Sequence, residues 1–234
     1  MLKTIARKVL NLVRRIPLRR YWRLREYTGG LLRPIVYREI HRTARKTGGT
    51  FLEVGAASGA ASIALAWGAG RLIIVEHFEG NSGSFWDREF PGASHSDNMN
   101  QLTRNLAHYG VLEKVTIYPH RFTDENAPEV LKLLGDAPLD GFMHDADGRL
   151  DRDFFWLWPR LVPGGTIIID DYPESGDTDH PKKRRTFRML NRIKEWGLFE
   201  EKKRLHDTVF GIKPHNADWS RFDRALLAQW AEKA

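Results

Sequence analysis

The sequence predicts an α/β fold, with a mostly parallel seven-stranded sheet, helices on both faces of the sheet and an antiparallel hairpin at the C-terminal end. Two observations support this prediction. Short apolar segments alternate with longer segments in which apolar residues recur every three or four positions, as on one face of a helix. The 234 residues are 41% hydrophobic and 29% charged, which suits one globular domain. Parallel strands joined by helices bind ligands at their carboxyl ends.

Five of the strands alternate with helices, and the other two form the hairpin. The five alternating strands are predicted at 50–56, 71–78, 114–120, 139–147 and 164–172. The helices are predicted at 31–46, after the small-residue turn at 57–62, and at 97–110, 127–135, 152–161 and 186–197. The hairpin is expected from 199–207 and 208–214, and a final helix from 218–234. The apolar face of this helix would dock on the domain or on a second subunit, so a homodimer is one expected arrangement.

The net charge of +7 is concentrated at the N-terminus. Residues 1–26 contain nine Lys and Arg and a single acid, Glu26, so this segment alone carries +8 and the rest of the chain is close to neutral. A domain without excess positive charge is not expected to follow a nucleic-acid backbone, so no nucleic-acid partner is predicted. The chain contains no cysteine, which excludes disulfides and fits a cytoplasmic location. We therefore divide the chain into a basic arm, residues 1–26, and a domain, residues 27–234.

The arm has the pattern of an amphipathic helix that ends at Pro17. Its apolar residues recur every three or four positions, and they are Leu2, Ile5, Val9, Leu12, Val13 and Ile16. The segment is too short and too charged to span a bilayer, but it suits a helix in an anionic membrane interface, with Tyr21 and Trp22 behind it. The protein would then be peripheral at the inner face of the membrane. The alternatives are a helix packed on the domain or on a second subunit, and an Arg-rich targeting peptide.

A glycine-rich turn follows the first strand of the domain. Glu53 lies near the end of this strand, and Gly55, Ser58 and Gly59 follow in the turn. Glycine lets a ligand approach the backbone, and the next helix offers free N–H groups at its N-terminus. Ala57 stands where a dinucleotide fingerprint would need its second glycine, which argues against hydride chemistry on a nicotinamide.

This turn resembles the E-V-G-x-x-x-G turn of the class I S-adenosylmethionine-dependent methyltransferases, and the resemblance extends over residues 45–214. It implies their Rossmann-like fold and S-adenosylmethionine as the cofactor. The implied cofactor-binding residues are Glu53, Gly55, Ser58, Gly59, Glu76, His77 and Asp145. The turn would hold the methionine part of the cofactor, and Glu76 would accept hydrogen bonds from the two ribose hydroxyls. The alternative for Glu76 is a helix-capping or surface acid.

Three further motifs occur in the order found in metal-dependent sugar O-methyltransferases of the macrocin O-methyltransferase type. They are EHFEG at 76–80, HDAD at 144–147 and DDY at 170–172. Catechol and caffeoyl-CoA O-methyltransferases are similar in layout. The resemblance implies transfer of a methyl group to a hydroxyl of a sugar or glycan. Because the basic arm suggests a membrane surface, a lipid-linked precursor is a further candidate acceptor. Residues 148–150 (Gly-Arg-Leu) depart from the aromatic continuation of the sugar enzymes, so the acceptor pocket is not defined by the resemblance.

The two aspartate motifs end neighbouring strands, so their carboxylates need a positive charge between them. A strand spacing of about 4.8 Å lets Asp145, Asp170 and Asp171 reach one ion, and such hard oxygen ligands suit Mg²⁺ or another divalent cation. The ion could bind two vicinal hydroxyls of the acceptor and lower the pKa of the one that is methylated. The resemblance makes Asp147 the general base, with His144 as a rival base or a buried structural residue. In a simpler interpretation, Asp147 and Asp171 cap helices.

Two other segments have both a functional and a structural interpretation. The polar segment 81–98 carries Phe85, Trp86 and Phe90, either as part of a lid over the ligands or as packing anchors. The basic run at 180–188 would attract an anionic acceptor or would be the solvated start of a helix. Two other functions stay open: a metal-independent small-molecule methyltransferase, and a non-catalytic methyltransferase-like scaffold at membranes or RNA. The intact glycine turn and carboxylates argue against the scaffold.

Overall fold

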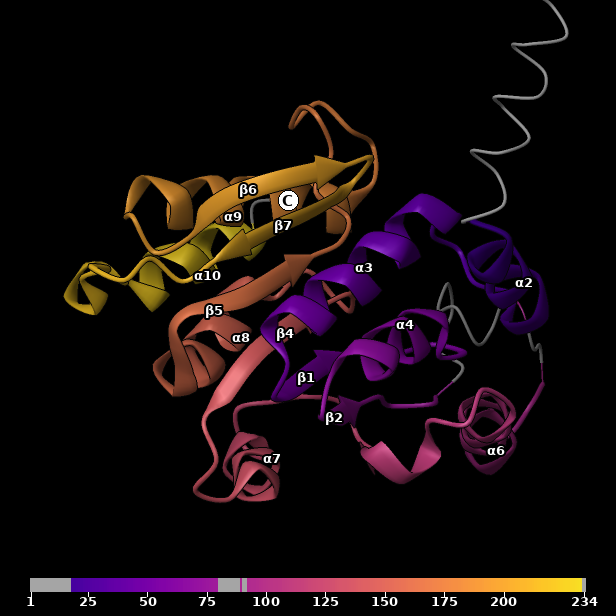
Figure 1. Ribbon diagram of the computed structural model, residues 1–234. Coiled ribbons are helices and arrows are strands. Elements are labelled where there is room, and N and C mark those ends of the chain that lie inside the picture. The colour runs from indigo at the N-terminus through magenta and orange to yellow at the C-terminus, as the bar shows by residue number, and fades with distance from the viewer. Residues whose placement is uncertain (1–17, 80–88, 90–91, 233–234) are drawn as a thin grey trace, which may run out of the picture.

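The computed structural model describes residues 18–79, residue 89 and residues 92–232. These residues form a seven-stranded sheet with the strand order β3-β2-β1-β4-β5-β7-β6 (Figure 1). The strands are β1 (Thr50–Val54), β2 (Arg71–Val75), β3 (Val115–Tyr118), β4 (Leu139–His144), β5 (Leu161–Ile169), β6 (Glu200–Leu205) and β7 (Thr208–Ile212). The first five strands are parallel, and β7 runs antiparallel to both β5 and β6. The predicted fold class is therefore confirmed.

Helices cover both faces of the sheet, because alternate residues of each buried strand point to opposite faces. On β1, Phe51 packs in one hydrophobic core, whereas Leu52 and Val54 pack in the other. The helices in the core of Phe51 are α2 (Arg19–Thr28), α3 (Pro34–Thr47), α4 (Ala60–Gly68) and α6 (His95–His108). The helices in the other core are α7 (Ala127–Leu134), α8 (Leu150–Leu157), α9 (Pro181–Glu195) and α10 (Arg224–Glu232). Figure 1 shows α3 and α4 in front of the sheet and α9 and α10 behind it.

Several elements have bounds that differ from the predicted ones. The strands β1 to β5 each end two or three residues earlier than predicted, and the helix predicted at 186–197 begins at Pro181. The Asp145 N–H still donates to the Val54 carbonyl at 2.8 Å, but the chain then leaves the sheet, so the acidic side chains lie at its edge. The predicted final helix is divided into a 3₁₀ turn at Trp219–Arg221 and α10. Asp218 accepts a hydrogen bond from the Ser220 N–H at 3.0 Å at the start of the turn, and Asp223 accepts one from the Leu226 N–H at 2.9 Å at the start of α10.

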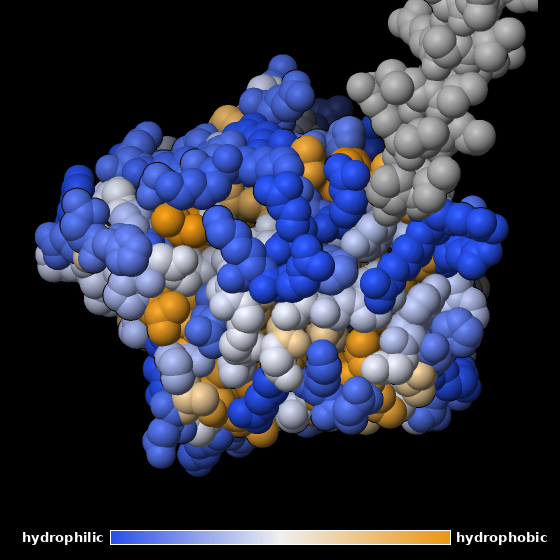
Figure 2. All heavy atoms as spheres, viewed as in Figure 1, coloured by the Kyte–Doolittle hydropathy of each residue, from blue (hydrophilic) through white to orange (hydrophobic). Residues whose placement is uncertain are grey.

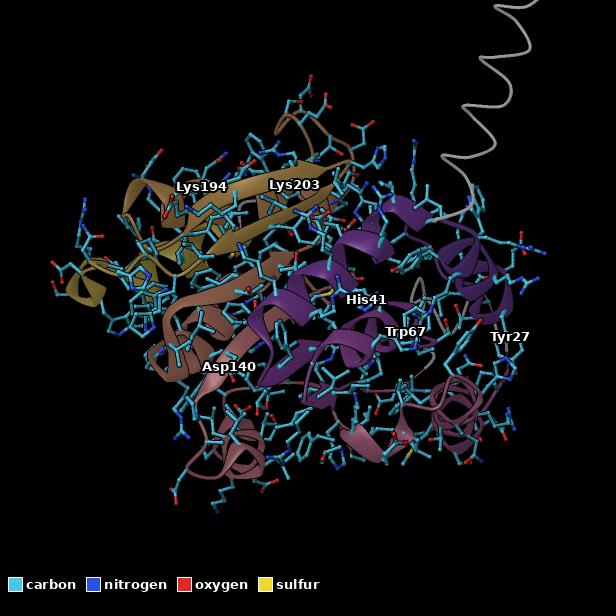
Figure 3. All side chains as sticks on the ribbon, viewed as in Figure 1. Tyr27, His41, Trp67, Asp140, Lys194 and Lys203 are labelled. Atoms are coloured by element: carbon cyan, nitrogen blue, oxygen red, sulfur yellow. The ribbon has the colours of Figure 1, made fainter. Side chains whose placement is uncertain are left out.

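The last part of the predicted arm is a helix that packs on the domain. Helix α2 buries Tyr21 and Leu24 in the core that it shares with α3 and α4. The Tyr21 hydroxyl shares a hydrogen bond with His41 Nδ1 at 2.7 Å, and His41 lies beside Trp67 (Figure 3). The boundary predicted after residue 26 thus falls inside α2, whereas the helix predicted before Pro17 lies outside the described residues. Within the described residues, no helix is both long and apolar enough to cross a membrane.

Leu24 tests the packing of α2 because its side chain is fully buried. Replacing Leu24 with Ala should lower the free energy of unfolding by about 2–5 kcal/mol, since apolar burial is lost and a cavity remains. The matched control is Leu31→Ala, because 58% of the Leu31 surface is exposed and its loss should change stability by less than about 0.5 kcal/mol. Urea denaturation followed by circular dichroism measures both values. Equal losses in the two variants would contradict the packing of α2 on the domain.

Candidate active site

Carboxylates gather where four neighbouring strands end at the same edge of the sheet. They belong to Glu53, Glu76, Asp145, Asp170 and Asp171, which lie at or just after the ends of β1, β2, β4 and β5. These strands are adjacent in the order β2-β1-β4-β5, so their ends lie side by side. A cavity of about 840 Å³ opens at this edge, and all of these acids except Glu53 line it. Gly55, His77 and Asp147 also line this cavity, so the structure brings most of the predicted site residues together.

The glycine turn has a backbone that requires glycine at two positions. Gly55 has a φ of 90°, and a Cβ at this position would lie 2.3 Å from the Asp145 carbonyl oxygen. Gly59 has a φ of 92°, and its Cβ would lie 2.4 Å from Leu102 Cδ1. The Ser58 carbonyl accepts a hydrogen bond from Asn105 Nδ2 at 2.7 Å, which ties the turn to α6. The turn is therefore held close to the end of β4, next to the cavity.

Glu76 is buried and organises this turn. Its Oε2 accepts hydrogen bonds from the N–H groups of Ala56 and Ala57, both at 2.8 Å. Its Oε1 accepts from the His77 N–H at 2.8 Å and lies 2.7 Å from His77 Nδ1. Burial acts to raise the pKa of Glu76, but these hydrogen bonds outweigh it and lower the pKa, so the group is a carboxylate. Glu76 is thus neither a helix cap nor a surface acid, and ribose hydroxyls would have to share or replace these bonds.

Glu53 lies behind the turn and has no exposed surface. The Ser62 hydroxyl donates to one carboxylate oxygen, and among the described residues Oε1 has no hydrogen-bond partner. Burial raises the pKa of Glu53 to about 8; the hydrogen bond from Ser62 opposes this shift, and the charge of Glu76 adds to it. Glu53 does not line the cavity, so its predicted contact with a cofactor would have to pass through the turn.

The three predicted metal ligands lie close together around a lysine. Single carboxylate oxygens of Asp145, Asp170 and Asp171 all lie within 4.8 Å of one another. Lys182 Nζ lies 2.6 Å from Asp171 Oδ2 and 3.4 Å from Asp145 Oδ1. The positive charge expected between the aspartate motifs is therefore supplied by the basic run at 180–188, which the sequence did not connect with these acids. Lys182 is the second residue of α9, so that helix begins at the cavity instead of in solvent.

The charges of this cluster shift the pKa values of its members in opposite directions. Burial and the charge of Asp170 raise the pKa of Asp145. Burial and the charge of Asp171 raise the pKa of Asp170 to about 6, against the hydrogen bond from Thr208. Lys182 lowers the pKa of Asp171 in spite of its burial. The lysine thus stabilises one carboxylate well, while the other two remain only partly compensated.

The three carboxylates could bind a divalent cation if the Lys182 ammonium moved away from them. Adjacent oxygens bound to one octahedral Mg²⁺ at about 2.0–2.1 Å lie roughly 2.9 Å apart, so the carboxylates of Asp145, Asp170 and Asp171, which lie within 4.8 Å of one another, would have to move closer together to hold the ion. Their oxygens are hard ligands of the kind that Mg²⁺ prefers. The ammonium of Lys182 and a metal ion would compete for the same oxygens, because both neutralise Asp145 and Asp171.

Asp147, the predicted general base, forms an ion pair with Arg152. The two guanidinium nitrogens Nη1 and Nη2 donate to the Asp147 carboxylate at 2.9 and 3.1 Å. Burial acts to raise the pKa of Asp147, but Arg152 holds this pKa well below its usual range. A carboxylate with such a low proton affinity is a weak base, so Asp147 could take a proton efficiently only if this pair opened.

His144 is a buried structural residue, which was one of its two predicted roles. Its ring has no exposed surface and does not line the cavity. Nδ1 lies 2.5 Å from Asp153 Oδ2, and Nε2 accepts a hydrogen bond from the Gly148 N–H at 3.0 Å. Arg152 also pairs with Asp153 at 2.6 Å, so one hydrogen-bonded chain connects the His144 ring to Asp147. This network fixes the loop between β4 and α8.

The helix-capping interpretation of the aspartates is wrong. The N-cap of α8 is Arg149 and the N-cap of α9 is His180, so neither Asp147 nor Asp171 holds that position. Asp171 has a φ of 56°, in the left-handed region that few non-glycine residues adopt. The aromatic residues of the predicted lid, Phe85, Trp86 and Phe90, lie outside the described residues, as does Gly80 of the EHFEG motif.

The high pKa of Glu53 predicts a pH dependence of stability. The ordinary pKa is 4.5, and the folded protein raises it to about 8. The folded state therefore holds a proton that the unfolded chain loses, so this contribution to stability is complete below about pH 4.5 and is lost as the pH rises to about 8. Urea denaturation at several pH values should show wild type losing stability relative to Glu53→Gln across this window. A constant difference between the two proteins would mean that Glu53 is charged at neutral pH.

Comparison with known proteins gives a family and several structural relatives. The model of the methyltransferase domain family matches residues 52–172, which is more than half of the chain. A putative caffeoyl-CoA O-methyltransferase from Staphylococcus aureus superposes with a TM-score of 0.63 at 18% identity, over 89% of this chain and 99% of that one. An O-methyltransferase of tomaymycin synthesis from Streptomyces achromogenes, in complex with S-adenosylmethionine, gives 0.58 at 21% identity, over 84% and 89%.

An O-methyltransferase from Bacillus cereus in complex with S-adenosylhomocysteine gives a TM-score of 0.56 at 17% identity, over 78% of this chain and 83% of that chain. At these identities the three structures establish a common fold. Among the curated proteins, none is similar enough to count as a match. The family model matches the segment that runs from β1, through the glycine turn, to Tyr172, and it contains all three acidic motifs. The chain therefore belongs to the methyltransferase domain family.

Proposed function

We propose that this protein is an O-methyltransferase that uses S-adenosylmethionine to methylate a hydroxyl group of its acceptor. The observation that carries the proposal is the position of Gly55. The turn at Gly55 and Glu76 lies against the backbone of Asp145, so the predicted cofactor site and the acidic cluster share one cavity. The O-methyltransferase relatives with bound S-adenosylmethionine or S-adenosylhomocysteine support this choice of cofactor and of acceptor atom. When bound, S-adenosylmethionine supplies an electrophilic methyl group.

The chain contributes three things to this reaction. The turn from Gly55 to Gly59, with Glu53 and Ser58, would hold the methionine part of the cofactor, and Glu76 with His77 would hold its ribose. Asp145, Asp170 and Asp171 would hold Mg²⁺ or another divalent cation, which lowers the pKa of a coordinated hydroxyl. The cavity walls would keep the acceptor oxygen aligned and exclude water. Asp147 is our candidate base in a complex where acceptor binding separates it from Arg152.

The acceptor class that we propose is a sugar or glycan with vicinal hydroxyls. The support is the combination of the three acidic motifs with a cavity of about 840 Å³, which is large enough for one sugar and part of a cofactor. Arg33 and Arg121 also line this cavity, and among the described residues neither forms an ion pair, so they could bind an anionic group of the acceptor away from the acidic cluster. A lipid-linked precursor would satisfy both conditions.

A metal-independent reaction is a second candidate, because Lys182 already neutralises Asp171. In that mechanism the ammonium would stay in place and donate a hydrogen bond to the acceptor oxygen. This bond would stabilise the negative charge left when Asp147 takes the hydroxyl proton, and that charge is lost as the oxygen–methyl bond forms and the methyl–sulfur bond breaks. The placement of Lys182 between Asp145 and Asp171 is the observation that favours this candidate.

A cytoplasmic location remains a proposal that is supported by the lack of cysteine in the chain. The absence of a nucleic-acid partner remains a proposal that is supported by the nearly neutral charge of the chain after residue 26. A homodimer through the final helix has less support, because α10 buries Leu227 in the core of its own domain. Attachment to the inner face of the membrane is a separate proposal, which depends on the basic arm.

Cofactor binding tests the proposed function directly. Calorimetric titration with S-adenosylmethionine should show binding to wild type and at least a tenfold loss of affinity in Gly55→Val, since the new side chain would meet the Asp145 backbone. The control is Gly92→Val, because nothing lies within 4 Å of a Cβ at Gly92. Equal thermal melting of Gly55→Val and the control would show that the turn variant folds. Equal cofactor affinity in all three proteins would contradict the proposed cofactor site.

Lys182→Met separates the metal-dependent mechanism from the metal-independent one. If Lys182 competes with a metal ion, its removal should raise the affinity for Mn²⁺ by roughly tenfold or more, because one positive charge leaves the carboxylates. Asp170→Asn should lower that affinity, and Lys202→Met, at an exposed ion pair on β6, should leave it unchanged. Calorimetry gives the three values. If Lys182→Met lost methyl transfer without binding Mn²⁺ more tightly, the metal-independent mechanism would replace the first.

A further inference from the structure

We propose that α2 and the loop after it form a docking surface for an anionic lipid bilayer. The surface consists of the exposed side of α2, with Arg19, Trp22, Arg23 and Tyr27, and of Leu31 in the loop after the helix. Figure 2 shows hydrophilic atoms over the edge of the molecule that α2 forms. The docking needs no particular reaction in the cavity, so it can be tested independently of the proposed function.

The basic side chains on this surface have little internal compensation. Arg19, Arg20 and Arg23 line a groove with Tyr27, between α2 and the end of α6. Among the described residues, no carboxylate lies within ion-pair distance of any of these three arginines, whereas most Lys and Arg residues around the cavity are paired. The Arg20 guanidinium stacks on the Trp67 ring at 3.3 Å from its centre, so Arg19 and Arg23 are the two that are left for a partner. Glu26 is the one acid that lines the groove. Guanidinium groups in this state suit the phosphates of an anionic membrane surface.

The apolar side chains of the surface are of the kind found in membrane interfaces. Trp22, Tyr27 and Leu31 are 43%, 51% and 58% exposed, and they are three of the four large hydrophobic residues that are exposed in the described part of the chain. The fourth, Phe155, lies on α8 under the guanidinium of Arg224. Figure 3 shows Tyr27 at the outer edge of the molecule, between α2 and α6. Exposed Trp, Tyr and Leu beside arginines match an interfacial helix.

The docking surface lies beside the cavity that holds the acidic cluster. Leu31, Leu32 and Arg33 line the cavity that holds the acidic cluster, and Leu31 also belongs to the docking surface. The mouth of the cavity therefore adjoins the surface that would face the bilayer. If the proposed function holds, an acceptor carried by a lipid could enter from this side without leaving the membrane.

The sequence before the surface favours an anionic partner over a second copy of this chain. Residues 1–17 contain five Lys and Arg and no acid, and they lead directly into α2. Positive charge is thus continuous along the chain up to the docking surface, while the rest of the chain is close to neutral. A second copy of this chain would bring the same positive charge against itself, so a subunit interface at α2 is disfavoured by repulsion.

Flotation of the full chain with lipid vesicles tests the proposal. Wild type should float with vesicles of phosphatidylcholine and phosphatidylglycerol in a ratio of about 7 to 3, and remain behind with phosphatidylcholine alone. Arg19→Glu with Arg23→Glu should weaken the binding at least tenfold. The matched control is Lys132→Glu with Lys202→Glu, which makes the same change of charge at exposed residues of α7 and β6 and should stay within twofold of wild type.

A second pair, Trp22→Ser with Leu31→Ser, isolates the apolar contribution. It should reduce binding mainly in high salt, where electrostatic attraction is screened. Thermal melting of each variant shows whether it is folded. The proposal is overturned if wild type does not float, if it binds both kinds of vesicle equally, or if the α2 charge variant binds as the control does. It is also overturned if the α2 variants change the mass in solution, since the surface would then be a subunit interface.

Discussion

The structure depends on one electrostatic constraint, which is the convergence of carboxylates at the carboxyl edge of the parallel sheet. Neighbouring strands place Asp145, Asp170 and Asp171 within 4.8 Å of one another, in a partly buried cavity where like charges repel strongly. Such a cluster is stable only if a cation lies among the oxygens or if protons are bound. Lys182 meets this need from the start of α9, so the position of that helix is coupled to the chemistry of the site.

A second cation, Arg152, keeps Asp147 apart from this cluster. It pairs with both Asp147 and Asp153, and Asp153 in turn orients the buried ring of His144. The result is two sets of acids with opposite properties. Asp147 is held ionised with a lowered pKa, whereas Asp145 has a raised pKa and an incomplete set of partners. A metal ion would bind to the cluster of Asp145, Asp170 and Asp171, because the repulsion between carboxylates is least compensated there.

Local sequence patterns were sufficient to predict the fold and the acidic residues of the site. They were not sufficient to predict Lys182 and Arg152, which form ion pairs with those acids. The alternation of strands and helices, the glycine turn and the acids after each strand are all visible within short segments, because each depends on neighbouring residues. The contacts of Lys182 and Arg152 depend instead on how α9 and α8 return to the sheet, which no local spacing encodes. One feature of the sequence could have predicted the contact of Lys182. Closely spaced acids end two strands, and a basic run at 180–188 follows them closely in the sequence. Helix α2 was not predicted as an element, because its segment is rich in arginine and buries only Tyr21, Leu24 and Thr28.

The central claim is that the acidic edge is neutralised by a cation that can be exchanged. A crystal structure of the protein grown with S-adenosylhomocysteine and Mn²⁺, with data collected at the manganese absorption edge, would test it most directly. The account predicts an anomalous peak bound by oxygens of Asp145, Asp170 and Asp171, with the Lys182 ammonium moved away from Asp171. A map with no peak among these carboxylates, and with Lys182 still in hydrogen-bond contact with Asp171, would contradict it.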